Sequence, residues 1–462
     1  MVSATTELAQ TLLAGAATEA DFRAARTQMA LSLGWHIVVA CFGVGMPALV
    51  LLAEWRGQRT GDPAYRLLAR RWARAMGVLF AVGAVSGTIL SFEMGVLWPG
   101  LMGRYGEVIG LPFALEGIAF FIEAIFLGIW LYAWDRLSPA GRLLAGLPVL
   151  LAGTASAFFV VTANAWMNQP TGFEIADGRV TDVRPWAAMF NAATPPQTVH
   201  MILAAFMVAG FGTASVYAVA MLRGRRDRYH RLGFLIPFVL AAALTPAQVV
   251  AGDWAARFLA ERQPVKLAAI EGLRETTAGA PLSIGGYYDG ERIRYAVEIP
   301  NGLSLLAHHD PHAVVRGLDE VPPDQRPPVN IVHWSFLAMV GVGTGLLALG
   351  GWFAVAWWRR RDLPRSRLFL RAAAVSGVAS VVALESGWIT TEVGRQPWVV
   401  YGLLRTEDAV NPAPGLTAGL LGVTVVYVVL TVTTVLVLRR MTRGTPIPEA
   451  PQESDVDEVR VA

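Results

Sequence analysis

A small set of side chains that can bind iron or carry protons stands inside long apolar stretches of this sequence. The set includes the imidazoles of His36 and His200, the thioether of Met339, and the carboxylates of Glu116 and Glu392. Imidazole and thioether groups serve as axial ligands of haem iron, and a carboxylate inside a membrane is costly enough to be a functional hypothesis by default. These residue types indicate either a redox centre or an ion-transport site.

Each of these residues also has an explanation that involves no chemistry. A single histidine in a membrane helix commonly hydrogen-bonds a neighbouring helix, and a single methionine usually packs against apolar neighbours. Glu392 and Arg395 can form a plain ion pair. The depth of the residues in the membrane decides between these explanations, and depth depends on the predicted spans.

The elements that carry these side chains are predicted to be transmembrane helices of an all-α integral membrane protein. The 462 residues are 54% hydrophobic and only 16% charged, against about 25% charged in soluble proteins. Cys41 is the single cysteine, which excludes a disulfide framework and a cysteine-ligated metal. A span needs about 20 mostly apolar residues. Nine stretches qualify: 28–53, 75–98, 112–134, 143–166, 198–222, 232–252, 331–357, 371–389 and 413–438.

The distribution of arginine predicts the orientation. Arginines crowd the connections 54–74, 223–231 and 358–371 and follow the last span, whereas the other connections are sparse in basic residues or too long to count. By the positive-inside rule the N-terminus lies outside and the C-terminus lies in the cytoplasm. An odd number of spans agrees with that orientation. No basic region precedes the first apolar stretch, so we expect no cleaved signal peptide.

Five segments follow from this topology. The polar connection between the sixth and seventh spans lies outside, and its length makes it a candidate functional segment. The C-terminal tail has the composition of a disordered segment. The predicted segments are an outer N-terminal segment over residues 1–27, six helices in 28–252, the outer loop 253–330, three helices in 331–438 and a disordered cytoplasmic tail 439–462.

The orientation places the candidate ligands at a common depth. His36, Glu116, His200 and Met339 all fall in the outer half of spans that run inward, and Glu392 lies at the outer end of a span that runs outward. Two histidines, a methionine and acidic groups at one depth suit axial ligation of haem iron. This shared depth favours a redox or transport site over isolated packing residues.

Several stretches go further and resemble a known family. GWHIVVACFGVGM, FEMGVLW, ALEGIAFFIEAIFLGIWLYAWDRLSP, ANAWMNQPTG, KLAAIE and GWITTEVGRQPW occur in the order and spacing of the large, haem-bearing subunit of cytochrome bd-type quinol oxidases. The resemblance extends from about residue 25 to 440. GRQPW and KLAAIE are its most specific parts.

The resemblance implies a set of haem ligands. His36 matches the axial ligand of haem d or of the neighbouring high-spin haem b, and members of the family differ in which of the two it binds. His200 and Met339 match the two axial ligands of the low-spin haem b, and Glu392 matches a ligand of the second high-spin haem. The sequence leaves open whether the oxygen site holds haem d or a substituted haem b.

The resemblance also implies a proton path and a quinol site. Glu116 matches a carboxylate beside the oxygen site, and Glu123, Asp135 and Ser156 match polar positions of a path for protons. The outer loop matches the quinol-binding loop of the family, in its short form. The quinol-associated positions fall on Lys266 and Glu271, and the GRQPW motif adds Arg395 and Trp398 near the cofactors.

Lys266 also stands out from the sequence itself. It is the single lysine among 38 basic residues, although a chance surface lysine is the plain alternative. Lysine is a compact donor whose pKa shifts readily, which suits a hydrogen bond to a quinol oxygen. Glu271 is expected to accept the quinol proton.

Three departures from the family pattern bear on the site. The family commonly has an arginine two or three residues before the axial methionine, where this chain has Leu337 and Ala338. We expect His333 or Arg395 to take over the influence of that arginine, unless the influence is absent.

The other two departures concern carboxylates. Glu116 and Glu123 are seven residues apart rather than the eight we expect, which makes the equivalence of Glu116 the less secure of the two. Glu93 stands in FEMG where glutamine is frequent and adds a carboxylate without an assigned role.

The resemblance implies subunit I of a terminal oxidase in the bacterial cytoplasmic membrane. Such an enzyme oxidises ubiquinol or menaquinol at the outer face and reduces O2 to water with cytoplasmic protons, which generates a proton motive force without pumping. Its partners are subunit II, membrane lipid and, in some members, a small accessory subunit, with no nucleic acid. Two alternatives remain. One is a haem-b quinone oxidoreductase subunit that does not reduce O2. The other is a proton-coupled secondary transporter, although this sequence lacks the internal repeat expected of that class.

Overall fold

Nine long helices form the body of the protein within the residues that the structure describes. The computed structural model describes residues 19–364 and 366–443, so most of the predicted tail and the first 18 residues lie outside it. Nine helices in those ranges are long and apolar enough to cross a membrane, which confirms the predicted number. Their bounds are α2 Glu19–Thr60, α3 Pro63–Leu97, α4 Pro99–Tyr132, α5 Pro139–Asn168, α7 Thr194–Leu222, α8 Arg228–Arg262, α11 Val329–Arg360, α12 Arg367–Val393 and α14 Leu416–Arg443.

Four of these helices begin with a side-chain cap. The Asp62 carboxylate accepts a hydrogen bond from the Ala64 backbone N–H before α3, and the Ser138 hydroxyl accepts one from Gly141 before α5. Asp227 and Ser366 cap α8 and α12 in the same way. Because an N-cap satisfies backbone donors that a helix leaves free, these residues fix where the four helices start.

The arginine-rich connections lie together at one end of the bundle. Arg228, the first residue of α8, pairs with Asp62, before α3, at 2.5 Å. Arg231 in the first turn of α8 pairs with Asp362 in the α11–α12 connection. We call this the arginine-rich end; the orientation of the chain across the membrane rests on it.

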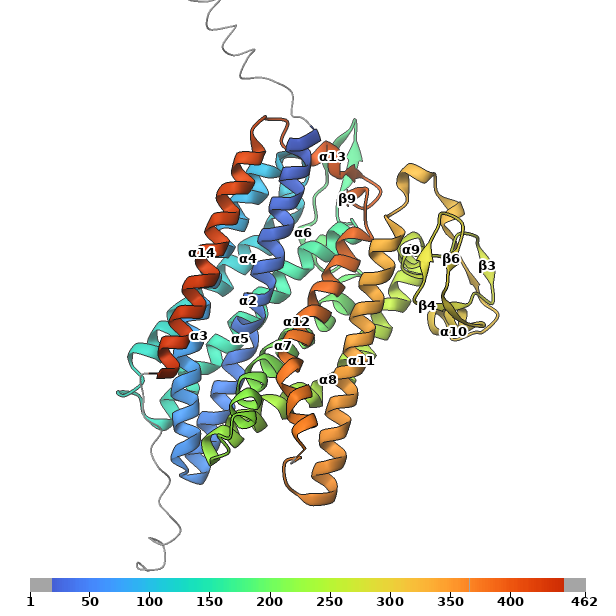
Figure 1. Ribbon diagram of the computed structural model, residues 1–462. Helices are drawn as coiled ribbons and strands as arrows, with labels where there is room; N and C mark the ends of the chain where they lie inside the picture. The colour runs from blue at the N-terminus through green and yellow to red at the C-terminus, as the bar shows by residue number, and fades with distance from the viewer. Residues whose placement is uncertain (1–18, 365, 444–462) are drawn as a thin grey trace, which may run out of the picture.

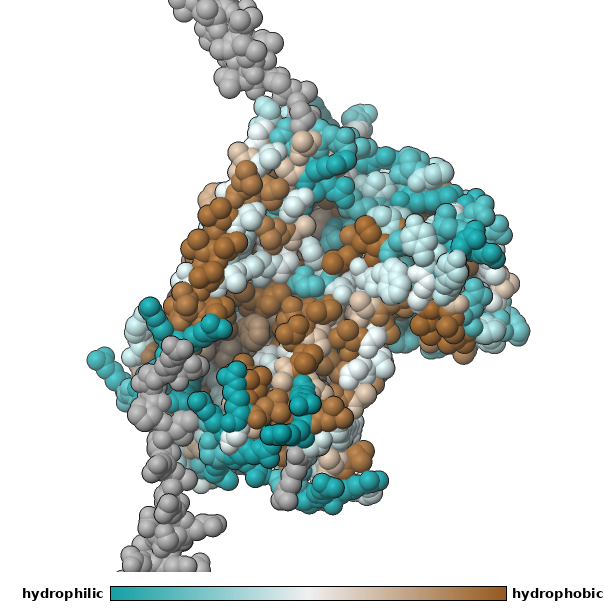
Figure 2. Space-filling view, in the orientation of Figure 1, coloured by the Kyte–Doolittle hydropathy of each residue, from teal (hydrophilic) through white to brown (hydrophobic). Residues whose placement is uncertain are grey.

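Four pairs of consecutive helices, α2–α3, α4–α5, α7–α8 and α11–α12, pack as antiparallel hairpins, and α14 lies along α2 and α3 (Figure 1). The main apolar core fills the half of the bundle near the arginine-rich end and includes Trp72, Phe211, Phe238 and Phe369. Apolar side chains also gather over the middle of the outer surface, with polar side chains at both ends (Figure 2). That belt is the surface expected to face lipid.

A folded segment lies beside the other end of the bundle (Figure 1). α8 continues beyond residue 252 to Arg262, and the polar connection after it contains short elements. They are α9 Pro264–Glu271, β3 Thr277–Ala278, β4 Leu282–Ile284, β5 Tyr287–Tyr288, β6 Ile293–Arg294, β7 Val297–Ile299, α10 Gly302–His308, β8 Val314–Val315, and the 3-10 turns Leu318–Glu320 and Pro323–Gln325. The strands pair antiparallel as β3–β8, β4–β7 and β5–β6.

Two hairpins and two short helices complete the same end. A hairpin of β1 Glu174–Ala176 and β2 Arg179–Thr181 precedes the short helix α6 Pro185–Met189. A second hairpin, β9 Trp398–Val400 with β10 Leu404–Arg405, follows α12 and leads into α13 Thr406–Ala409. All the strands are two or three residues long, so the fold class remains all-α.

Candidate redox site

His36 lies on α2 with one ring nitrogen held by α3. Its Nδ1 is 2.7 Å from the hydroxyl oxygen of buried Ser86, and that hydroxyl donates to the Gly83 carbonyl. Because the hydroxyl hydrogen is already used, Ser86 accepts from the Nδ1–H of His36. This tautomer leaves the lone pair on Nε2, which is the arrangement found in metal-binding histidines whose other nitrogen is hydrogen-bonded.

His200 lies on α7 and faces α8. Its Nε2 is 3.1 Å from the amide nitrogen of Gln248, whereas its Nδ1 is buried without a hydrogen-bond partner among the described residues. Buried polar atoms nearly always have a partner. A buried ring with one nitrogen unsatisfied is compatible with a ligand that supplies the missing interaction.

Met339 lies on α11 against α12. A Cβ atom at Gly387 would stand 2.8 Å from the Met339 sulfur, so the glycine leaves room for the thioether. His333, six residues earlier, does not offer a free ring to replace the missing arginine. Its two nitrogens are occupied by the backbone carbonyls of Ile270 and Gly285.

Glu392 is the centre of a polar cluster where α12 meets α5. Arg395 donates to one carboxylate oxygen at 2.5 Å, and the Asn164 amide donates to the other at 2.7 Å. Arg395 is 3% exposed and also reaches the Asn164 amide oxygen at 3.3 Å. The ion pair that the sequence allows is therefore present, and both oxygens of Glu392 are engaged.

The cluster continues to Lys266 through α5. The Asn168 amide donates to the Asn164 amide oxygen at 2.8 Å, and the Lys266 ammonium nitrogen lies 2.6 Å from the Asn168 amide oxygen. Lys266 is 2% exposed. Burial, with the nearby positive charge of Arg395, lowers the pKa of Lys266 from 10.5 to about 7. Lys266 is thus a buried member of the same network as Glu392 and not a surface lysine.

Glu271 ends the same short helix, α9. Its side chain is buried, the Ser283 backbone N–H donates to it, and one of its oxygens has no hydrogen-bond partner among the described residues. Burial raises the pKa of Glu271 from 4.5 to about 7. Both ends of α9 therefore carry a buried group that changes charge near neutral pH.

A cavity of about 140 Å³ opens beside α9. Val265, next to Lys266, forms one wall, and Arg395 and Trp398 of the GRQPW motif form another. Tyr401 and Pro327 are among its other lining residues, whereas Lys266 and Glu271 do not line it. The cavity joins an aromatic ring, a guanidinium and the start of α9, which is a combination suited to a planar polar ring.

The carboxylates of α4 face α5. The Ser156 hydroxyl donates to Glu116 at 3.2 Å. Glu123 is 6% exposed, and a Cβ atom at Gly153 would stand 3.2 Å from its carboxyl carbon. The two carboxylates, two turns apart on α4, therefore follow one line along the α4–α5 interface.

Asp135 lies apart from that line, just beyond the end of α4. It is largely exposed and pairs with Arg70 at 2.7 Å. A carboxylate that the sequence did not single out is buried nearby: Glu54 is 1% exposed and accepts from Arg142 at 2.6 Å. The arginine-rich end thus carries both an exposed and a buried acidic group.

Glu93 lies between α2 and α3, next to α14. One of its oxygens accepts from the Gln28 amide at 2.8 Å and from the Ser32 hydroxyl at 3.0 Å. Its other oxygen is buried without a hydrogen-bond partner among the described residues. Its side-chain hydrogen bonds in the described ranges of the chain go to Gln28 and Ser32 and to none of the ligand candidates.

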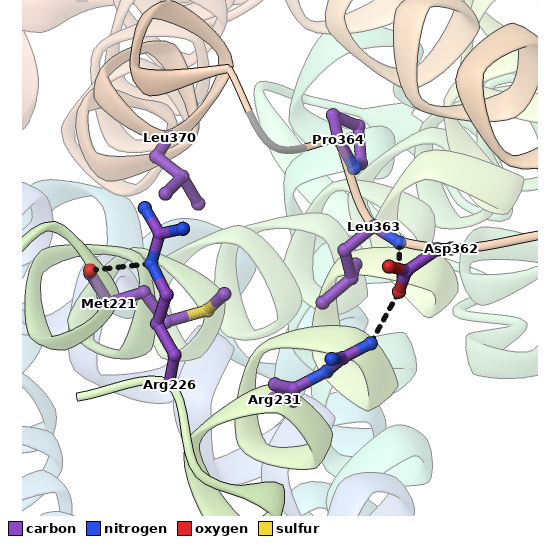
Figure 3. Close-up of a pocket in the computed structure, with 7 residues that line it drawn as sticks. All are labelled: Met221, Arg226, Arg231, Asp362, Leu363, Pro364 and Leu370. Atoms are coloured by element: carbon purple, nitrogen blue, oxygen red, sulfur yellow. Dashed lines mark hydrogen bonds and ion pairs between the residues drawn. The ribbon is translucent and has the colours of Figure 1, made fainter. Parts of the chain in front are cut away.

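A second cavity, of about 120 Å³, lies at the arginine-rich end, between the α7–α8 and α11–α12 connections. Arg226 donates to the Met221 carbonyl and Arg231 pairs with Asp362 across it (Figure 3). None of the candidate ligands lines this cavity. Its arginines belong to the clusters on which the predicted orientation rests.

Sequence reasoning missed the partners of the candidate residues. Ser86 and Gln248 lie on other helices than the histidines they contact. Asn164 and Asn168 could have been found, because they are two amides four residues apart in an apolar span and so share one helical face.

The chain matches the family model described as cytochrome bd terminal oxidase subunit I over residues 24–446. A Bacillus subtilis (strain 168) protein with the provisional name cytochrome bd menaquinol oxidase subunit I is 41% identical over 438 residues, covering 93% of this chain and 98% of that protein. A second protein of that strain, named cytochrome bd ubiquinol oxidase subunit 1, is 31% identical and covers 86% of each chain.

A solved structure is similar over the same range. The bd oxidase from Geobacillus thermodenitrificans superimposes with a TM-score of 0.88 at 38% identity, covering 92% of this chain and 99% of that one. Sequence and fold agree over nearly the whole length. The chain therefore belongs to the cytochrome bd terminal oxidase subunit I family.

Proposed function

We propose that this chain is the haem-bearing subunit of a quinol oxidase that reduces O2 to water. The observation that carries the proposal is the buried network from Lys266 through Asn168 and Asn164 to Glu392. It joins the folded outer segment to a candidate haem ligand within a few hydrogen bonds. Family membership supports the same activity.

The quinol site is proposed at the cavity beside α9. Oxidation of a quinol to a quinone releases two electrons and two protons, so the site needs a hydrogen-bonding partner for the ring oxygen and an acceptor that takes up the two protons one after the other and passes them on. Lys266, with a pKa of about 7, can donate to that oxygen. Glu271, with a pKa of about 7, is partly ionised at neutral pH and can take up the proton.

The haem ligands are proposed to be His36, His200, Met339 and Glu392. The free Nε2 lone pair of His36 and the unpartnered ring nitrogen of His200 suit this role. A porphyrin supplies four ligands of its own, so single side chains from separate helices suffice. When bound, haem supplies electron transfer and oxygen reduction; this subunit would carry a low-spin haem b, a high-spin haem b and haem d or a substituted haem b.

Protons for water formation are proposed to come from the arginine-rich end, which the positive-inside rule assigns to the cytoplasm. Asp135 and Glu54 lie at that end, and Glu123, Ser156 and Glu116 continue along the α4–α5 interface. Moving one charge across 100 mV requires about 2.3 kcal/mol. Quinol oxidation on one side and proton uptake from the other would store energy without a pump.

The remaining assignments follow from family membership. A second membrane subunit, subunit II, is the expected partner, and the bacterial cytoplasmic membrane is the expected location. Relatives are named for menaquinol and for ubiquinol, so either quinol is a candidate substrate.

A reduced-minus-oxidised spectrum of the purified oxidase, followed by quinol-driven O2 uptake, tests the proposal. We expect haem b bands, a band near the red end that carbon monoxide shifts, and O2 uptake on addition of quinol. A secondary transporter would show no haem bands. A haem-b subunit that does not reduce O2 would show b bands without O2 uptake, and either result would refute the proposal.

A further inference from the structure

His333 lies at the outer end of α11 with both ring nitrogens facing backbone carbonyls. Nδ1 is 2.6 Å from the Ile270 carbonyl oxygen and Nε2 is 3.0 Å from the Gly285 carbonyl oxygen. The residue is 1% exposed. A carbonyl oxygen only accepts, so the ring makes these contacts by donating N–H to the backbone of the two segments.

Both carbonyls belong to the surroundings of Glu271. Ile270 precedes Glu271 on α9, and Gly285 lies two residues after Ser283, whose backbone N–H donates to the Glu271 carboxylate. His333 therefore holds the helix that carries Glu271 and the strand end that hydrogen-bonds it. Both segments are thus hydrogen-bonded to the imidazole ring of His333.

A second side chain of α11, that of Asn330, hydrogen-bonds the backbone next to the β4–β5 turn. The Asn330 amide oxygen accepts from the Tyr288 backbone N–H at 2.8 Å, and its amide nitrogen donates to the Tyr288 carbonyl at 2.9 Å. α11 thus contacts the chain on both sides of the β4–β5 turn. Because α11 also carries Met339, about 9 Å beyond His333 along the helix axis, the contacts of Asn330 and His333 fix the outer segment to the helix of a candidate haem ligand.

We propose that His333 is a positioning residue for quinol oxidation, because its two hydrogen bonds hold α9 and the β4–β5 turn and so fix the place of Glu271 next to the proposed quinol site. The inference rests on the proposed quinol site. His333 touches neither quinol nor haem in this proposal; it acts through the placement of Glu271.

The test compares His333→Leu and His333→Gln with His312→Leu, a control at an exposed histidine of the same segment, all in the complete oxidase. We expect His333→Leu to raise the KM for quinol about tenfold, and His333→Gln, which offers donors in one direction only, to raise it less. Haem spectra, and the O2 uptake rate with a small artificial one-electron donor, should stay at wild-type values. The control should match wild type throughout.

The outcomes separate this inference from the quinol site itself. A wild-type KM in His333→Leu, alongside a raised KM in Lys266→Ala and Glu271→Gln, would overturn the positioning role and leave the quinol site standing. Wild-type KM values in all three would overturn the quinol site. If His333→Leu loses its haems, His333→Gln decides: a wild-type KM with intact spectra there would also overturn the role.

Discussion

The two ionisable groups at the ends of α9 should give this helix an unusual dependence of stability on pH. Lys266 and Glu271 are both buried, and each has its pKa moved to about 7 from opposite directions. A pH series on the wild-type oxidase and on two variants, Lys266→Met and Glu271→Gln, tests this dependence.

Whether the free energy of unfolding rises or falls with pH depends on which state, folded or unfolded, holds the proton. Between pH 7 and 10.5 the unfolded helix keeps the Lys266 proton and the folded helix does not, so the free energy of unfolding rises with pH across that window. Between pH 4.5 and 7 the folded helix keeps the Glu271 proton and the unfolded helix does not, so the free energy of unfolding falls as pH rises. α9 should be least stable near pH 7.

The magnitudes follow from the size of each shift. One pKa unit corresponds to about 1.4 kcal/mol. Across the Lys266 window the free energy of unfolding therefore changes by about 5 kcal/mol, and across the Glu271 window by about 3 kcal/mol, as orders of magnitude. Even half of either value would change the population of the open helix more than fivefold.

Hydrogen–deuterium exchange of the α9 backbone amides measures this local opening, once the intrinsic exchange rate is corrected for pH. In the wild-type protein we expect protection to be lowest near pH 7 and to increase on both sides. In Lys266→Met the protection should stop changing with pH above pH 7 only, and in Glu271→Gln below pH 7 only. An alkaline side that keeps its slope in Lys266→Met would show that Lys266 does not titrate in this range.

Three further predictions concern the transmembrane sites. His200→Ala and Met339→Leu should each remove the low-spin haem b spectrum and stop quinol-driven O2 uptake, while the high-spin haems stay at least partly bound; an unchanged spectrum in both would refute the assignment. Glu123→Gln should slow O2 reduction severely while quinol still reduces the low-spin haem; proteoliposomes with a pH dye on the cytoplasmic side would report normal proton uptake if the path lies elsewhere. Glu93→Leu should lower the melting temperature, because each of the two donors it leaves unpaired costs about 1–3 kcal/mol, whereas Glu93→Gln keeps an acceptor for them and should melt like wild type.

The number of spans could be predicted because a helix that crosses the lipid must consist of mostly apolar residues over its whole span, which hydropathy detects. The ends of the helices could not, since a helix continues beyond the membrane with polar residues. α8 runs past residue 252 through Asp253 and Arg257, which form an ion pair one turn apart at 2.9 Å. α4 likewise starts at Pro99 and not at 112, through a turn that contains Arg104 and Glu107.

The candidate residues could be predicted one at a time, but their partners could not. A histidine in a span is visible in the sequence, whereas the hydroxyl of Ser86 or the amide of Gln248 becomes significant only after two helices pack in register. The same limit explains His333: the sequence places it near Met339 along one helix, but the side chain turns to the folded segment between α8 and α11, whose path no periodicity reveals.

The single lysine of the chain can now be explained physically. At the Lys266 position the side chain is buried and its nitrogen lies 2.6 Å from one amide oxygen, that of Asn168, with the guanidinium of Arg395 contributing further positive charge. An arginine there would stay charged at any physiological pH and would bring five N–H donors. A lysine can lose its proton in this environment, which removes the cost of a buried charge and leaves an amine able to donate to or accept from a ligand. In a sequence that uses arginine at its other 37 basic positions, lysine occurs where a neutral basic group is physically useful.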